Sequence, residues 1–149
     1  MPDRSWTRRG ALGTALALVA IPWPALAQED PAVEATIRDL IGRREPEEGG
    51  MALRLPALAE HGGQVPLTVT VDSPQTAERH VTAIHILATR NPTPGVASFR
   101  LTPHVARAEV QTRIRLAADQ RVLAIAAFND GTLRRASAET RVGQGGCLT

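Results

Sequence analysis

The sequence predicts an all-β fold: an immunoglobulin-like antiparallel β-sandwich of about seven strands, with one short N-terminal helix and a flexible C-terminal tail. Two observations lead to this fold class. After Gly50, apolar and polar residues alternate with a period of two, which is typical of strands with one buried face. Clusters of Gly, Pro, Asn and Asp separate these runs, as they do in sandwich domains.

The single helix is predicted to begin at about residue 31. In EDPAVEATIRDLIGRR, Asp30 suits the N-cap and Pro31 suits the first helical position. Gly42 can end the helix in a left-handed conformation. The charged stretch RREPEEGG, residues 43–50, is interpreted as a solvated linker. Four apolar residues fall on one face of this helix: Val33, Ile37, Leu40 and Ile41.

Seven runs after the linker are expected to form strands. The run at 107–117 alternates most cleanly between apolar and polar positions. Asn-Asp-Gly at 129–131 is a strong hairpin-turn signal between the last two runs. The runs span residues 51–58, 64–73, 80–90, 96–103, 107–117, 121–128 and 132–142.

The run RVLAIAAF at 121–128 is apolar on both faces, which predicts a central strand or one covered by a partner. If one face packs on the sandwich core, the opposite face carries Leu123, Ile125 and Ala127. The short helix is expected to cover only part of that face. A second subunit is therefore predicted to cover the remainder.

The first 27 residues are predicted to be a bacterial secretory signal peptide. Arg8 and Arg9 precede an apolar run from Ala11 to Ile21, and Ala25–Ala27 provides the small residues that signal peptidase needs. The adjacent arginines in TRRGAL resemble a twin-arginine export motif. The apolar run is too short to span a bilayer, so no stable membrane insertion is expected. The mature protein is expected to be periplasmic.

Removal of this leader changes the charge balance. The full chain has 17 basic residues, all Arg, and 15 acidic residues. The leader takes three arginines and one aspartate, so 14 of each remain and the mature net charge is near zero. Both tryptophans also lie in the leader, and the chain has no tyrosine. A nucleic-acid partner is not expected, because neither a basic surface nor stacking aromatics are available.

Motifs for enzyme chemistry are missing from the sequence. There is no GxGxxG before a helix, no Walker loop and no GxSxG. The histidine spacing does not resemble a metal site, so neither a metal nor a cofactor is expected. The carboxylates offer no candidate pair for acid–base catalysis. The histidines are His61, His80, His85 and His104.

The most distinctive feature is Cys147, the only cysteine, third from the end of the chain. It follows Gly143, Gly145 and Gly146 in a tail expected to span residues 143–149, after a domain at 28–142. Five residue steps from Val142 give a reach of about 17 Å, at roughly 3.3–3.6 Å per residue. A thiol with a pKa of about 8.5 is only slightly ionised at neutral pH, which suits a passive covalent handle. A free thiol on a frayed tail and a thiol enzyme are the alternatives.

Several segments together resemble the SoxY family, the sulfur carriers of the periplasmic Sox thiosulfate-oxidation system. They are the twin-arginine leader, DPAVEATIRDLIG, VPLTVTVDSP, IHILATRNPTPGVASFRLTP, AEVQTRIRLA and the terminal GGC. The resemblance implies that sulfur intermediates bind covalently to Cys147 and that Gly145 and Gly146 form a swinging arm. It does not exclude a plain interaction module without a sulfur load.

The resemblance also implies partners. The family forms a heterodimer with a second β-sandwich subunit, SoxZ. Its client enzymes are a thiosulfate-conjugating c-type haem enzyme, a sulfate-releasing hydrolase and a sulfane dehydrogenase. In one respect the sequence departs from the family pattern, because Leu148 and Thr149 stand where two further glycines usually follow the cysteine. This departure puts productive entry into each partner's channel in question.

Overall fold

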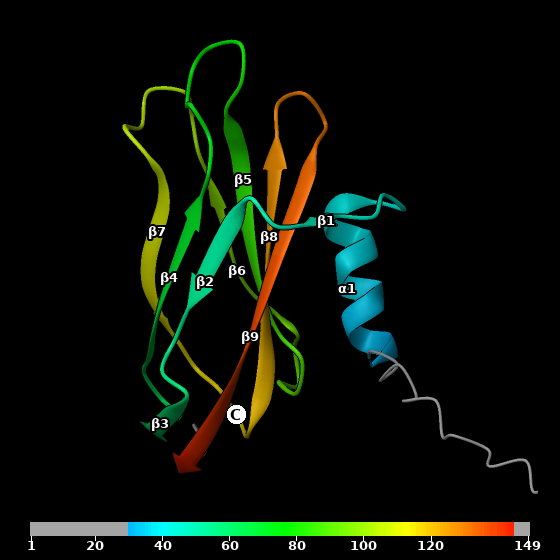
Figure 1. Ribbon diagram of the computed structural model, residues 1–149. Helices are drawn as coiled ribbons and strands as arrows, with labels where there is room; N and C mark the ends of the chain where they lie inside the picture. The colour runs from blue at the N-terminus through cyan, green and yellow to red at the C-terminus, as the bar shows by residue number, and fades with distance from the viewer. Residues whose placement is uncertain (1–29, 145–149) are drawn as a thin grey trace, which may run out of the picture.

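A computed structural model describes residues 30–144, in which one helix stands beside two packed β-sheets (Figure 1). This confirms the predicted all-β sandwich with a short N-terminal helix. The helix is α1 (Pro31–Ile41). The strands are β1 (Glu47–Glu48), β2 (Met51–Arg54), β3 (Leu58–His61), β4 (Val65–Val71), β5 (Val81–Ala88), β6 (Gly95–Arg100), β7 (Ala108–Ile114), β8 (Gln120–Phe128) and β9 (Leu133–Gln144).

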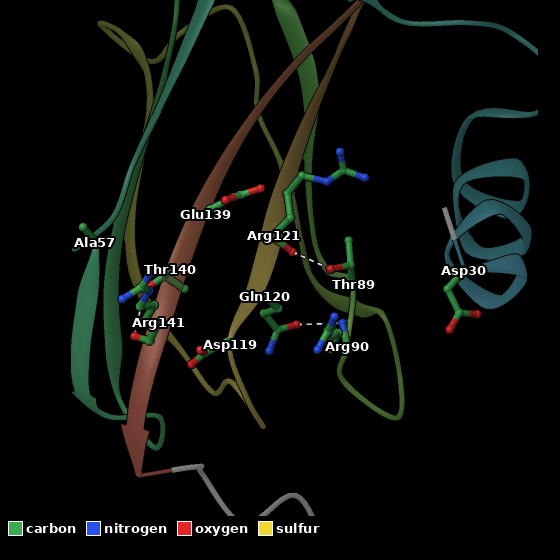
Figure 2. A pocket seen from close by; sticks show the side chains of 10 residues that line it. All are labelled: Asp30, Ala57, Thr89, Arg90, Asp119, Gln120, Arg121, Glu139, Thr140 and Arg141. Atoms are coloured by element: carbon green, nitrogen blue, oxygen red, sulfur yellow. Dashed lines mark hydrogen bonds between the residues drawn. The ribbon is translucent and has the colours of Figure 1, made fainter. Parts of the chain in front are cut away.

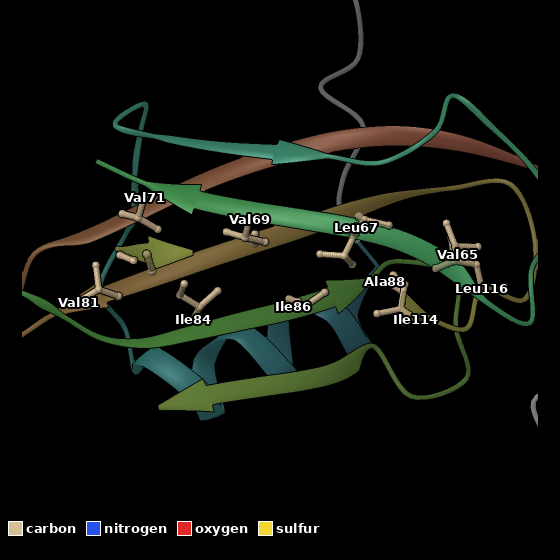
Figure 3. Packing of buried hydrophobic residues seen from close by; sticks show 14 of the residues in the cluster. Val65, Leu67, Val69, Val71, Val81, Ile84, Ile86, Ala88, Ile114 and Leu116 are labelled. Carbon is tan, nitrogen blue, oxygen red and sulfur yellow. The ribbon is translucent and has the colours of Figure 1, made fainter. Parts of the chain in front are cut away.

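The larger sheet has the order β1-β9-β8-β5-β6, and β3 also pairs with β9. The smaller sheet has the order β2-β4-β7. Figure 3 shows the apolar residues that fill the space between the two sheets, among them Val69, Ile84 and Ile86, all fully buried. This interior forms because the alternate apolar residues of each strand point toward the opposite sheet.

Two short strands were not predicted. Within the stretch interpreted as a solvated linker, β1 pairs in parallel with β9, and Glu47 forms an ion pair of 2.8 Å with Arg134. The predicted first run at 51–58 contains β2 and only the beginning of β3. The unpredicted strands β1 and β3 both pair with β9, so they are defined by this long neighbour rather than by a sequence pattern of their own.

The predicted ends of the helix are confirmed. The Asp30 side chain accepts a hydrogen bond from the backbone N–H of Ala32 (2.9 Å), and Pro31 occupies the first position. At the other end, Gly42 has a φ of 72° and donates its N–H to the carbonyl of Arg38 (2.8 Å). Glycine adopts this positive φ without the steric cost that other residues incur.

The prediction that a second subunit covers one face of β8 is wrong. Leu123 and Ile125 on that face are 2% and 0% exposed within this chain alone. They pack against Val33 and Ile41 of α1, so the chain's own helix seals the face. The apolar stripe of α1 is sufficient because Leu87 and Leu133 from the neighbouring strands complete the same cluster.

Candidate functional site at the end of strand β9

The described part of the chain ends at the root of the cysteine tail. Cys147, Gly145 and Gly146 lie outside the described residues, as do the export arginines Arg8 and Arg9. Their predicted roles therefore stay predictions. Gln144 is the last residue of β9 and stands three positions before the cysteine in the sequence. Its surroundings define where the tail leaves the domain, beside β3 at the lower end of the sandwich in Figure 1.

Gly143 belongs to β9 and not to the predicted tail at 143–149. A Cβ atom at this position would lie 3.0 Å from the carbonyl oxygen of Glu60 in β3, a separation that real Cβ atoms rarely show. The glycine therefore permits two backbones to approach closely. Its role in the described structure is packing, which corrects its assignment to a swinging arm.

One edge of the β9 end is held by β3 and the residues next to it. Arg141 donates its backbone N–H to the carbonyl of Ala57 (2.9 Å), and the pairing with β3 continues to Gln144. The carbonyl of Gln144 accepts a hydrogen bond from Gly62 (2.7 Å). The carbonyl of Gly62 in turn accepts one from Leu116 (2.8 Å), a fully buried residue. The last residue of β9 is thus connected to the core by two successive hydrogen bonds.

The opposite edge of the β9 end is held by an aspartate. Pairing between β8 and β9 stops at Gln120 and Thr140, so β9 extends beyond its partner strand. There the carboxylate of Asp119 accepts a hydrogen bond from the backbone N–H of Val142 (2.7 Å). The sequence pattern gave Asp119 no role. No local motif marks it, because its partner is 23 positions away along the chain.

A depression of about 940 Å³ lies at the lower ends of β8 and β9 (Figure 2). Asp30, the N-cap of α1, also contributes to its lining. Its lining carries three basic and three acidic side chains, so it is not a site selective for anions. The polar backbone is internally bonded here, since Thr89 donates to the carbonyl of Arg121 and Arg90 donates its N–H to Gln120 (both 2.9 Å). The charged lining residues are Asp30, Arg90, Asp119, Arg121, Glu139 and Arg141.

The described histidines do not converge on a common site. The ring nitrogen Nδ1 of His85 lies 2.8 Å from the hydroxyl of Ser98, and that of His80 lies 3.0 Å from the carbonyl of Thr76. Partial burial, and secondarily the charge of Arg100, lower the pKa of His85. Among residues 30–144, no group of three or more His, Cys, Asp or Glu side chains could hold a metal ion. The helix in this range is not long and apolar enough to cross a membrane.

Solved structures show where this fold has been seen before. The sulfur carrier protein SoxY from Chlorobium limicola f thiosulfatophilum aligns with a TM-score of 0.63 and 29% identity, over 74% of this chain and 96% of its own. A superoxide reductase (neelaredoxin) from Ignicoccus hospitalis aligns with a TM-score of 0.56 and 19% identity, over 68% of this chain and 85% of its own. The latter similarity establishes only a shared fold. No curated protein matches the sequence significantly.

The sequence also matches a family model. The model is that of the sulfur oxidation protein SoxY, and the match runs from residue 37 to residue 147. It covers most of the described domain and ends on the cysteine itself. The chain therefore belongs to the SoxY family of sulfur oxidation proteins.

Proposed function

We propose that this protein carries sulfur intermediates bound covalently to Cys147 and presents them to partner enzymes. The observation that carries the proposal is the position of the only cysteine, three residues beyond the fixed end of β9, at the last residue of the family match. The sulfur carrier function of the Chlorobium SoxY, a structural relative over 96% of its length, supports it.

The geometry of the domain suits presentation rather than catalysis. Three residue steps beyond Gln144 allow the cysteine Cα a reach of about 10 Å, at roughly 3.3–3.6 Å per residue. This is shorter than the reach expected from Val142, because β9 continues for two more residues. A thiol on so short a tether can enter a cleft of a partner only when the partner's surface comes close to the end of β9. The partner then supplies the groups that ionise the thiol and transfer sulfur.

The partners and the compartment belong to the same proposal. We expect a SoxZ-like subunit as the stable partner. A thiosulfate-conjugating c-type haem enzyme, a sulfate-releasing hydrolase and a sulfane dehydrogenase are expected as clients. The stable partner must bind elsewhere than the outer face of β8, since α1 already covers that face. Export through the twin-arginine route, with cleavage after residue 27, would place all of them in the periplasm.

Intact-mass spectrometry of protein isolated from its native host during growth on thiosulfate tests this function. A carrier gives mass increments of one or more sulfur atoms, or of a thiosulfonate group, which a thiol reductant removes. Cys147→Ser should abolish every such increment. Unmodified wild-type protein under these conditions would favour the alternative of a sandwich-type interaction module without a covalent load.

A further inference from the structure

The end of β9 is bonded along both edges although only one edge has a strand beside it. Successive backbone N–H groups of the strand point to opposite edges. The N–H of Arg141 donates to the carbonyl of Ala57, next to β3. The N–H of Val142 points to the opposite edge, where pairing with β8 has already ended. There the Asp119 carboxylate accepts the hydrogen bond that a strand carbonyl would otherwise accept (2.7 Å). The aspartate thus holds β9 at Val142, two residues beyond Thr140, the last residue that pairs with β8.

From these contacts we infer that Asp119 and Gly143 are positioning residues that fix the root of the cysteine tether. Asp119 holds one edge of β9, and Gly143 allows β3 to close on the other edge. The tether consequently begins at Gln144 and not at Thr140, where pairing with β8 ends. The inference about sulfur transfer rests on the proposed carrier function. The fixing of the tether root does not depend on it.

The length of the tether decides how precisely the thiol is delivered. A chain freed from Thr140 would have seven residue steps to Cys147, whereas a chain fixed at Gln144 has three. The volume that the thiol can explore grows steeply with this length, so its concentration at the mouth of a partner's cleft falls as the root loosens. A carboxylate is suited to the root because hydrogen bonds to charged acceptors are stronger than those to neutral ones.

Amide hydrogen exchange, measured by NMR on the mature chain, tests the hydrogen bond between Val142 and Asp119. Asp119→Ala should accelerate exchange of the Val142 N–H by at least about tenfold, because the group loses its acceptor. Asp119→Asn is the matched control, since its amide oxygen can still accept the bond, and it should retain most of the protection. Gly143→Ala should accelerate exchange at Gly62 from the β3 side, because the added methyl group meets Glu60. Unchanged exchange at Val142 in Asp119→Ala would overturn the inference.

A nitroxide spin label on Cys147 reports the looseness of the tether independently of any sulfur chemistry. Its motion should become faster in Asp119→Ala and Gly143→Ala but remain near that of the wild type in Asp119→Asn. The melting temperature measured beside it separates a loosened root from a destabilised fold. Label motion that is unaltered in all three variants would overturn the positioning role even if amide exchange changes.

Sulfur loading in the native host connects the root to function. The fraction of Cys147 carrying sulfur should fall severalfold in Asp119→Ala at an unchanged melting temperature, and Asp119→Asn should restore it. If wild-type protein carries no sulfur at all, the carrier function fails while the exchange and label results still decide the fixing of the root. If the wild type is loaded and Asp119→Ala is loaded equally, positioning is refuted and the carrier function stands.

Discussion

The two ends of the sandwich are held in different ways. At the hairpin end, formed by the β4–β5 loop and the β8–β9 turn, side chains connect one loop to the other. Asn129 accepts from the N–H of His80 (3.0 Å) and donates to the carbonyl of Glu78 (3.1 Å). Arg79 pairs with Asp130 (2.7 Å) and lies over the ring of Phe128, 4.8 Å from its centroid. Side chains from both loops therefore hold this end together.

At the tether end, backbone groups hold the edge of β9 that faces β3, whereas the Asp119 side chain holds the other edge. The pairing of β3 with β9 and the bond from Gly62 to Gln144 use main-chain atoms alone. Side chains there remain at the surface, and Leu58 is 61% exposed, one of the two large apolar side chains exposed in the described region. The edge of β9 that is held by backbone groups can vary its side chains for contact with partners, whereas changing Asn129 at the hairpin end removes bonds that join the two loops.

The largest contrast in stability is expected between Ile125 and Leu58. Ile125→Arg places an unpaired charge in the sealed layer between β8 and α1, and it should destabilise the fold by more than about 4 kcal/mol. Leu58→Arg at the exposed tether end should change stability by less than about 0.5 kcal/mol. Chemical denaturation of both variants measures the difference. A folded Ile125→Arg that only loses a binding partner would restore the subunit interface rejected above.

A smaller loss is expected at the hairpin end. Asn129→Ala removes two side-chain hydrogen bonds that join the loops and should cost about 1–3 kcal/mol. Arg107→Ala is the control, because this exposed residue precedes β7 at the same end. Thermal unfolding compares the two. If the loss in Asn129→Ala is no greater than in Arg107→Ala, the side chains do not hold this end.

The pH dependence of stability tests the partly buried His85. Because its pKa is lowered in the folded state, the unfolded chain binds a proton more readily once the pH falls below the ordinary value of 6.5. Stability should therefore decrease as the pH falls from 6.5 and level off below the pKa of the folded state. In denaturation curves measured across this range, His85→Gln should have a shallower slope than the wild type. Identical slopes would exclude His85 as the source.

The smallest effect on stability is expected from the cysteine. Cys147→Ser lies beyond the last strand and should shift the free energy of unfolding by no more than about 0.5 kcal/mol. Calorimetry of the mature protein is sufficient to measure it. A loss of several kcal/mol would mean that the cysteine is part of the core, which would contradict a role as an exposed carrier.

The sequence predicted most elements whose pattern is local. The helix follows from Asp30, Pro31 and Gly42, and the hairpin follows from Asn-Asp-Gly, where Gly131 has a φ of 85°. Alternation was sufficient to place β4 and β5 within one or two residues and β7 within three. In each case the signal lies within a few neighbouring positions and reflects backbone preferences or one buried face.

Elements defined by distant partners were missed. β1 and β3 have little pattern of their own, and each forms only because β9 offers a free edge. The role of Asp119 arises because pairing of β9 with β8 stops at Thr140, two residues before Val142. The spacing of residues in the sequence does not reveal this. The cover of β8 by α1 was underestimated because Leu87 and Leu133 add to the apolar stripe of the helix from separate strands.

Relocation of the thiol tests the central claim most directly. In Cys147→Ser/Ser137→Cys the chain still has one exposed thiol, but on the rigid middle of β9 and not on the tether. Intact-mass spectrometry of this variant and of the wild type, both isolated from the native host on thiosulfate, compares the two positions. We predict reductant-sensitive sulfur on the wild type and none on the relocated thiol. Equal loading of both would show that any exposed cysteine is modified, and it would contradict a dedicated carrier.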